Sequence, residues 1–295
     1  MMVFEAKGII PAMVTPLDQH GNVNKMALRQ LTDYLIDGGV HGLFPVGSTG
    51  EWYGLTLAQK KDIMETVIEQ ANGRVPVYAG TGAITTKETV ALTQMAASVG
   101  VEAVSVLTPV FISPSQEELY QHYKTVAESV SIPVLLYNNP GKTGITIEGA
   151  LVERLSKIEN ILGIKDSSGN LTLTGEYIRR TDASFAVLCG TDTLILGTLC
   201  YGGKGSITAT ANIVPSIPVR IYQEFVRGNL EQARKAQFEL APLRLAFSLA
   251  TFPVVMKEGL RLVGIDVGTT LKPVGEMTAE NRAKLKKVLE DMGAV

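Results

Sequence analysis

One lysine of this 295-residue chain, Lys165, stands near the end of an apolar run, Ile161 to Gly169, that has the composition of a buried strand. Burial penalises the charged ammonium and lowers its pKa, which favours the neutral amine that attacks a carbonyl carbon to form a Schiff base. An ion pair with a neighbouring Asp or Glu also explains a lysine at this place. The residue alone leaves both interpretations open.

A phenol and a hydroxyl-rich turn end two other apolar runs. Tyr137 lies near the end of the run Pro133 to Pro140, where its phenol can pass protons to and from a substrate, although most single tyrosines are core residues with one hydrogen bond. The turn Gly47-Ser48-Thr49-Gly50-Glu51 presents backbone N–H groups and two hydroxyls, which suits a carboxylate or a phosphate. The simpler interpretation is a glycine turn whose Ser and Thr bond their own backbone.

Glycine-bearing loops follow the last two apolar runs, Cys189-Gly190-Thr191-Asp192 and Gly202-Gly203-Lys204-Gly205-Ser206. Such loops can bind a phosphorylated substrate or let the backbone approach a small acid. A tight turn that needs a positive φ is the commonest reason for a glycine of this kind. The loops therefore permit a phosphate site without requiring one.

Metal catalysis and a bound cofactor are not expected. The histidines, His20, His41 and His122, do not fall together at the end of any apolar run, and the carboxylates there are scattered. We therefore predict no essential metal and no cofactor.

The elements that must position these groups alternate regularly along the chain. Short apolar runs rich in β-branched residues recur eight times, each followed by a helical pattern, and most are apolar throughout, as in parallel strands buried on both faces. Eight such units in about 225 residues predict a (β/α)8 TIM barrel, since a doubly wound sheet normally stops at five or six strands. The predicted strands are Gly8 to Pro16, Gly42 to Gly47, Val75 to Gly82, Ala103 to Pro109, Pro133 to Pro140, Ile161 to Gly169, Phe185 to Asp192 and Gly203 to Thr210.

The strand signal ends at Gly228, and a C-terminal helical extension follows. Asn229 to Ala250, Pro253 to Val263 and Thr278 to Met292 have helical patterns. The predicted organisation is therefore a catalytic barrel over residues 1–228 and a helical domain over residues 229–295. In a barrel, the carboxyl ends of the strands form the site, which is where Lys165 and Tyr137 stand.

Composition limits the partners. With 27 Lys+Arg against 29 Asp+Glu, a formal charge of -2 and a pI near 6.0, the chain has no basic field for nucleic acid or an anionic membrane. No apolar run approaches the roughly 18 residues of a membrane span, and the N-terminus lacks a signal-peptide pattern. The only cysteines, Cys189 and Cys200, are expected to be buried thiols in a reducing compartment. We predict a cytoplasmic protein with a small-molecule substrate.

Four motifs in this order resemble the dihydrodipicolinate synthase and N-acetylneuraminate lyase family of Schiff-base pyruvate aldolases, along nearly the whole chain. They are Gly47-Ser48-Thr49-Gly50-Glu51, Tyr137-Asn138-x-Pro140 with Thr143-Gly144, Gly163-Ile164-Lys165-Asp166, and Gly190-Thr191-Asp192.

The resemblance implies a role for several residues. Lys165 would form the imine with pyruvate or another 2-oxo acid, and Tyr137 would be the acid/base. Ser48 and Thr49 would hold the pyruvate carboxylate and orient Tyr137, while Gly190 and the Ile207 backbone would form a wall of the site. A homotetramer built from tight dimers is implied as well.

Departures from the family pattern bear on the aldehyde substrate. Phe111 replaces a tyrosine that completes a proton relay across the dimer interface in lysine-pathway synthases, and Lys142 replaces an arginine that clamps the aldehyde's carboxylate. Ser167 stands where those enzymes tend to carry Ala, and its hydroxyl suits a hydroxylated chain. Thr193 stands where sialic acid lyases tend to place a glutamate.

These departures favour a 2-keto-3-deoxy-sugar-acid aldolase. The alternatives within the family are 4-hydroxy-tetrahydrodipicolinate synthase, which joins pyruvate and aspartate semialdehyde, and then N-acetylneuraminate lyase. Outside the family, the alternatives are a phosphosugar enzyme or metal-assisted lyase on the same barrel, and a non-catalytic sensor of 2-oxo acids. The sensor would have lost efficient proton transfer at Phe111.

Overall fold

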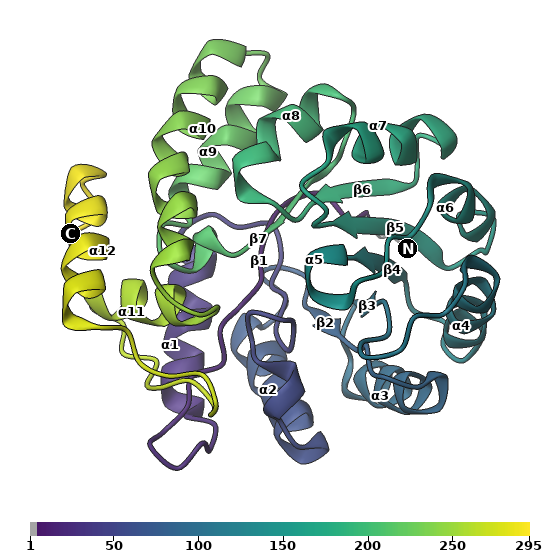
Figure 1. The fold of residues 1–295 in the computed structure, drawn as a ribbon, viewed down its shortest axis with the longest axis horizontal. Helices are drawn as coiled ribbons and strands as arrows, with labels where there is room; N and C mark the ends of the chain where they lie inside the picture. Colours follow the sequence, from purple (N-terminus) through teal and green to yellow (C-terminus); the bar gives the residue numbers. More distant parts are fainter. Residues whose placement is uncertain (1–4) are drawn as a thin grey trace.

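A computed structural model describes residues 5–295 and contains one curled parallel sheet surrounded by helices, as predicted (Figure 1). Seven strands lie in the order β1-β7-β6-β5-β4-β3-β2, and every neighbouring pair is parallel. The strands are β1 (Gly8–Pro11), β2 (Tyr78–Gly80), β3 (Ala103–Leu107), β4 (Val134–Asn138), β5 (Ile161–Asp166), β6 (Ala186–Cys189) and β7 (Gly205–Thr208).

The second predicted strand, Gly42 to Gly47, is reduced to isolated bridges, but it closes the barrel. Phe44 pairs with Ala12 just after β1, and Leu43 pairs with Val77 just before β2. The Pro45 carbonyl still accepts a hydrogen bond from the Gly80 N–H at 3.2 Å, but regular pairing ends there because Pro45 has no N–H to donate and Val46 adopts a positive φ of 58°. Seven strands and this short segment therefore form the eight-membered ring that the sequence predicts.

Helices cover the outside of the ring, except for the short, unpredicted helix Pro140–Thr143, which lies at the mouth of the barrel and carries Lys142 of the cavity (Figure 1). The segment after β6 begins as a 3-10 turn, Asp192–Leu194, and becomes an α-helix only at Ile195. The barrel helices are α1 (Lys25–Asp37), α2 (Leu57–Ala71), α3 (Thr86–Val99), α4 (Gln116–Glu128), α5 (Pro140–Thr143), α6 (Gly149–Leu155), α7 (Leu171–Arg180), α8 (Ile195–Cys200) and α9 (Ser216–Val226).

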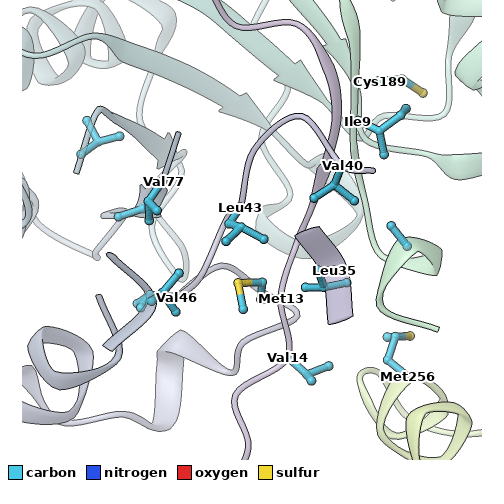
Figure 2. Close-up of a cluster of buried hydrophobic side chains, with 14 of the residues drawn as sticks. Ile9, Met13, Val14, Leu35, Val40, Leu43, Val46, Val77, Cys189 and Met256 are labelled. Carbon is cyan, nitrogen blue, oxygen red and sulfur yellow. The ribbon is translucent and has the colours of Figure 1, made fainter. Parts of the chain in front are cut away.

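Successive side chains on each strand point to opposite faces, which gives the barrel two apolar layers. Ile9 belongs to the large cluster between strands and helices, whereas Ile10 belongs to a small inner cluster with Phe44, Tyr78 and Leu188. Figure 2 shows part of the outer cluster, where side chains from the first strands meet Leu35 and Met256. The strands are thus fixed from both faces, which holds their carboxyl ends rigidly.

The chain after residue 229 forms α10 (Leu230–Leu245), α11 (Val254–Leu262) and α12 (Ala279–Asp291) on one side of the barrel (Figure 1). The division into a barrel and a separate helical domain stays a prediction. None of the helices within residues 5–295 has the length and apolar character needed to cross a bilayer. Cys189 is buried as expected, whereas the expectation for Cys200 was wrong, because its side chain is exposed at the end of α8.

Candidate active site

The register of β4 and β5 brings the predicted lysine and phenol together. Tyr137 is paired with Lys165 in the parallel ladder, so the two side chains leave the sheet on the same face. Lys165 also pairs with Leu188 of β6, which belongs to the inner cluster of the barrel. Both functional groups therefore point into the mouth of the barrel.

The next residue along β5 points the other way and holds the loop after the strand. Asp166 accepts hydrogen bonds from Asn138 Nδ2 at 2.9 Å and from Thr174 Oγ1 at 2.6 Å. Because its carboxylate is occupied on the outer face, it does not pair with the adjacent lysine. This alternation leaves the amine free for chemistry.

Lys165 is buried to 5% exposure and forms no ion pair with any carboxylate of residues 5–295. Its Nζ lies 4.3 Å from the centroid of the Tyr137 ring and 5.4 Å from that of Phe44. Of the two interpretations that the sequence left open, the ion-paired lysine is therefore absent from the described part of the chain. The amine is held between aromatic rings on a cavity.

Tyr137 is also 5% exposed, and its surroundings favour the phenolate. Burial by itself raises the pKa of this phenol, but the positive charge of Lys165 and hydrogen bonds with Ser48, Asn139 and Ser167 outweigh it and lower the pKa. The Asn139 amide donates to the phenol oxygen at 2.9 Å. A phenol with a lowered pKa exchanges protons more readily near neutral pH.

The turn after the second barrel segment is anchored by a buried carboxylate. Glu51 is 0% exposed, and its side chain contacts Lys257 Nζ of α11 at 2.7 Å and accepts a hydrogen bond from the Leu271 backbone N–H at 2.7 Å. Lys257 also donates to the Thr269 carbonyl at 2.5 Å. The chain segment that carries Ser48 and Thr49 is therefore tied to the C-terminal part of the chain.

Gly190 lets the loop after β6 approach the end of β5. Its N–H donates to the Asp166 carbonyl at 2.7 Å, and a Cβ added to it would lie 2.0 Å from Ser167 Oγ. No side chain fits there without moving Ser167. Glycine is thus required here by the close approach of Ser167, a reason that differs from the phosphate, small acid or positive φ considered for this loop from the sequence.

These residues surround one cavity of about 260 Å³ at the carboxyl ends of the strands. All eight predicted site residues line it: Ser48, Thr49, Tyr137, Lys142, Lys165, Ser167, Gly190 and Ile207. Their roles remain proposals. The cavity also has lining residues that sequence reasoning missed, notably Asn139, Arg244, Phe247 and Phe252.

These residues were missed for different reasons. Asn139 follows Tyr137 in a motif that the sequence already singled out, so its side chain could have been added to the candidates. Arg244 and Phe247 come from α10 and the turn after it, and Phe252 comes from the connector to α11. Helical periodicity does not indicate that these segments return to the mouth of the barrel.

Comparison with known proteins agrees with this geometry. The model of the dihydrodipicolinate synthetase family matches residues 5–292. The chain belongs to this family. It is 40% identical over 286 residues to 4-hydroxy-tetrahydrodipicolinate synthase of Archaeoglobus fulgidus, covering 97% of this chain and 98% of that protein. The corresponding Methanopyrus kandleri enzyme is 35% identical over 294 residues, covering 99% and 98%.

Solved structures of the same family have the same fold. Dihydrodipicolinate synthase from Bacillus anthracis superposes with a TM-score of 0.95 at 36% identity, covering 98% of this chain and 99% of that one. YagE, a prophage protein of this family from E. coli, was solved in complex with pyruvate and gives a TM-score of 0.94 at 32% identity over 98% and 99% of the two chains. This chain is therefore a pyruvate-dependent Schiff-base lyase of the dihydrodipicolinate synthetase family.

Phe111 does not line the cavity of this synthetase-family enzyme. Its side chain is 96% exposed, and its backbone has a positive φ of 74°, which is uncommon for a bulky residue. Ile112 beside it is 45% exposed. Phe111 and Ile112 therefore form an exposed apolar tip on the loop after β3.

The histidines and carboxylates do not form a metal site in the described structure. Within residues 5–295 no group of three or more His, Cys, Asp or Glu side chains is arranged to hold an ion. Asp192 does line the cavity, but its carboxylate accepts a hydrogen bond from the Thr210 backbone N–H at 2.7 Å.

Proposed function

We propose that this enzyme condenses pyruvate with L-aspartate 4-semialdehyde and is a 4-hydroxy-tetrahydrodipicolinate synthase. Full-length similarity to the synthases of A. fulgidus and M. kandleri supports this substrate pair. This similarity favours the synthase, which was the alternative, over the 2-keto-3-deoxy-sugar-acid aldolase that the departures from the family pattern suggested. The observation that carries the chemistry is the Tyr137–Lys165 pair, buried together on the cavity.

In the proposed reaction, the neutral Lys165 amine attacks the C2 carbonyl of pyruvate, and loss of water gives a protonated imine. The imine draws electrons from the pyruvate methyl carbon, which loses a proton and becomes the nucleophilic end of an enamine. That carbon bonds to the aldehyde carbon of the acceptor, whose oxygen takes up a proton. The acceptor's amino group then attacks the imine carbon, closes the ring and releases Lys165, so that one water is lost overall.

Each proposed role has a structural basis. Tyr137 moves the protons, supported by its lowered pKa and its place beside the Lys165 amine. Ser48 and Thr49 bind the pyruvate carboxylate, supported by their position on the same cavity, in a turn anchored through Glu51. Gly190 and Ile207 line the same cavity and form a wall of the proposed pyruvate site.

Borohydride reduction in the presence of pyruvate tests the covalent step. We expect a stable adduct on the peptide that contains Lys165, and none in Lys165→Ala. An unmodified wild-type peptide would refute the proposal. Aspartate semialdehyde as acceptor then tests the substrate, and turnover with it at ordinary enzyme rates excludes a non-catalytic sensor. Unchanged activity in EDTA excludes a metal-assisted lyase.

A 2-keto-3-deoxy-sugar-acid aldolase is the second candidate. It is favoured by Phe111, which has no hydroxyl to relay a proton, and by the Ser167 hydroxyl at the cavity. A higher kcat/KM for pyruvate with glyceraldehyde than with aspartate semialdehyde would establish it. The homotetramer is likewise a proposal from the family resemblance, checked by sedimentation equilibrium.

A further inference from the structure

A second, much smaller cavity of about 10 Å³ lies beside the candidate site. Its lining includes Ser48, Ser105, Leu107 and Tyr137. Ser48 and Tyr137 also line the larger cavity that contains the Lys165 side chain, so these two residues stand between the two spaces. The small cavity has room for about one water molecule.

Strand β3 directs the Ser105 side chain into this small cavity. Ser105 is paired with Leu135 of β4, and Leu107 is paired with Tyr137, so both β3 residues leave the sheet on the inner face of the barrel. Along the strands, Ser105 is therefore two residues, or about 7 Å, deeper in the barrel than Tyr137. Its side chain is 1% exposed, and its Oγ has no hydrogen-bond partner within residues 5–295.

The unpartnered hydroxyl of Ser105 calls for a ligand, because a buried hydroxyl without a hydrogen bond destabilises a fold. The buried serine of β7 shows the usual arrangement: Ser206 is 0% exposed and donates to the Cys189 carbonyl at 2.8 Å. A water in the small cavity accepts the Ser105 hydrogen and needs at least one further polar partner to stay there. The Ser48 hydroxyl lines the same cavity and supplies that partner.

We propose that Ser105 is a positioning residue for Tyr137: it holds one water in the small cavity, and this water directs the Ser48 hydroxyl toward the phenol oxygen. The inference rests on the proposed function only for the use that Tyr137 makes of its proton. The water site itself does not depend on any substrate. Ser105 touches no substrate and takes no part in imine formation.

The direction of the Ser48 hydroxyl follows from its hydrogen-bonding capacity. A hydroxyl carries one hydrogen and two lone pairs. A water that donates to the Ser48 oxygen from the small cavity leaves the Ser48 hydrogen for the larger cavity, where the Tyr137 oxygen is its partner. Hydrogen bonds in such a chain strengthen one another. Lys165, the charged group beside the phenol, acts from β5 and is not part of this chain.

The first test measures the ionisation of Tyr137 without substrate, by ultraviolet difference titration of each protein against the same protein with Tyr137→Phe. We expect Ser105→Ala to raise the pKa of Tyr137, because the phenolate loses part of its hydrogen bond from Ser48. Ser48→Ala should raise it at least as much, and Ser48→Ala/Ser105→Ala should not exceed Ser48→Ala, since both residues act through one contact. Additive shifts in the double variant, or none in Ser105→Ala, would overturn the inference.

Ser206→Ala is the matched control, because it removes a buried serine hydroxyl from a strand position that lines neither cavity. It should leave the titration of Tyr137 unchanged. Thermal unfolding tests the water itself: in a dry cavity, Ser105→Ala would remove an unsatisfied hydroxyl and raise the Tm, whereas we expect the Tm to stay or fall. A rise in Tm, or no water beside Ser105 Oγ in a crystal structure that resolves other buried waters, rejects the inference.

Kinetics with pyruvate separates this inference from the proposed function. In Ser105→Ala, the acidic limb of the kcat–pH profile should move to higher pH, while plateau kcat and the KM for pyruvate stay within about twofold and borohydride still traps pyruvate on Lys165. A raised KM with an unmoved limb indicates a structural defect and rejects the positioning role. If wild type traps no pyruvate, the proposed function fails, and the titration, the Tm and the crystal structure still decide the inference.

Discussion

Lys257→Met should unfold this enzyme more easily and loosen its candidate site, because Lys257 is the buried partner of Glu51. The two side chains are 2% and 0% exposed, and their charged atoms lie 2.7 Å apart. At an effective dielectric constant of 20, their attraction is about 6 kcal/mol. Most of it offsets the desolvation of the two ions, so the net value of the pair is small.

Removing only the lysine is different, because Glu51 then keeps its desolvation cost and loses the attraction. The expected loss of unfolding free energy is about 3 to 5 kcal/mol. For a chain of this size such a loss lowers the Tm by on the order of 10 °C, measured by calorimetry or circular dichroism. In Glu51→Gln/Lys257→Met, no unpaired charge remains, and much of the stability should return.

The control is Lys284→Met, which breaks an ion pair of the same 2.7 Å length with Glu280 on the surface of α12. Those side chains are 55% and 77% exposed, and the variant should keep the wild-type Tm. Lys257→Met should also raise the KM for pyruvate, since the Glu51 contact anchors the turn of Ser48 and Thr49. A Tm within about 2 °C of wild type in Lys257→Met would refute the argument.

Further predictions concern the groups around the amine. Tyr137→Phe should lower kcat by about 10² to 10⁴ while borohydride still traps pyruvate on Lys165, because proton transfer is lost but the amine is not. Ser167→Ala removes a hydrogen bond that lowers the pKa of Tyr137, so the acidic limb of the kcat–pH profile should move to higher pH; an unmoved limb contradicts that coupling. Gly190→Ala should raise the KM for pyruvate, since the new Cβ would lie 2.0 Å from Ser167 Oγ, and Gly190→Ala/Ser167→Gly should recover part of the loss. Phe111→Tyr should raise kcat with aspartate semialdehyde if a tyrosine there relays protons, and Ile112→Tyr should not.

The inner residues of the site were predictable because strand geometry leaves little freedom. Once a parallel barrel is inferred, residues near the carboxyl ends of neighbouring strands must meet, and Tyr137 and Lys165 are in register across β4 and β5. The same reasoning places Gly190 beside them. It overestimated the length of several strands, most of all the first, which ends at Pro11 and not at Pro16, and the second, which is reduced to isolated bridges before Pro45 and the positive φ of Val46.

The outer residues were not predictable, since no local pattern records long-range packing. Glu51 was one of several scattered carboxylates in the sequence, and its partner Lys257 lies in a helix after the barrel. Arg244 belongs to a helical pattern, and such a pattern does not predict which side of the helix faces the barrel. Such contacts depend on how α10 and α11 pack on the finished fold.

The two halves of the cavity therefore differ in how they are built, and this difference separates chemistry from specificity. The imine half stands on β4 and β5, which are packed on both faces, so its geometry is fixed by the barrel itself. Other residues of the cavity lining come from α5, the end of α10 and the following connector, outside the strands of the barrel. We therefore expect substitutions in these outer segments to alter acceptor choice while borohydride trapping of pyruvate on Lys165 stays intact.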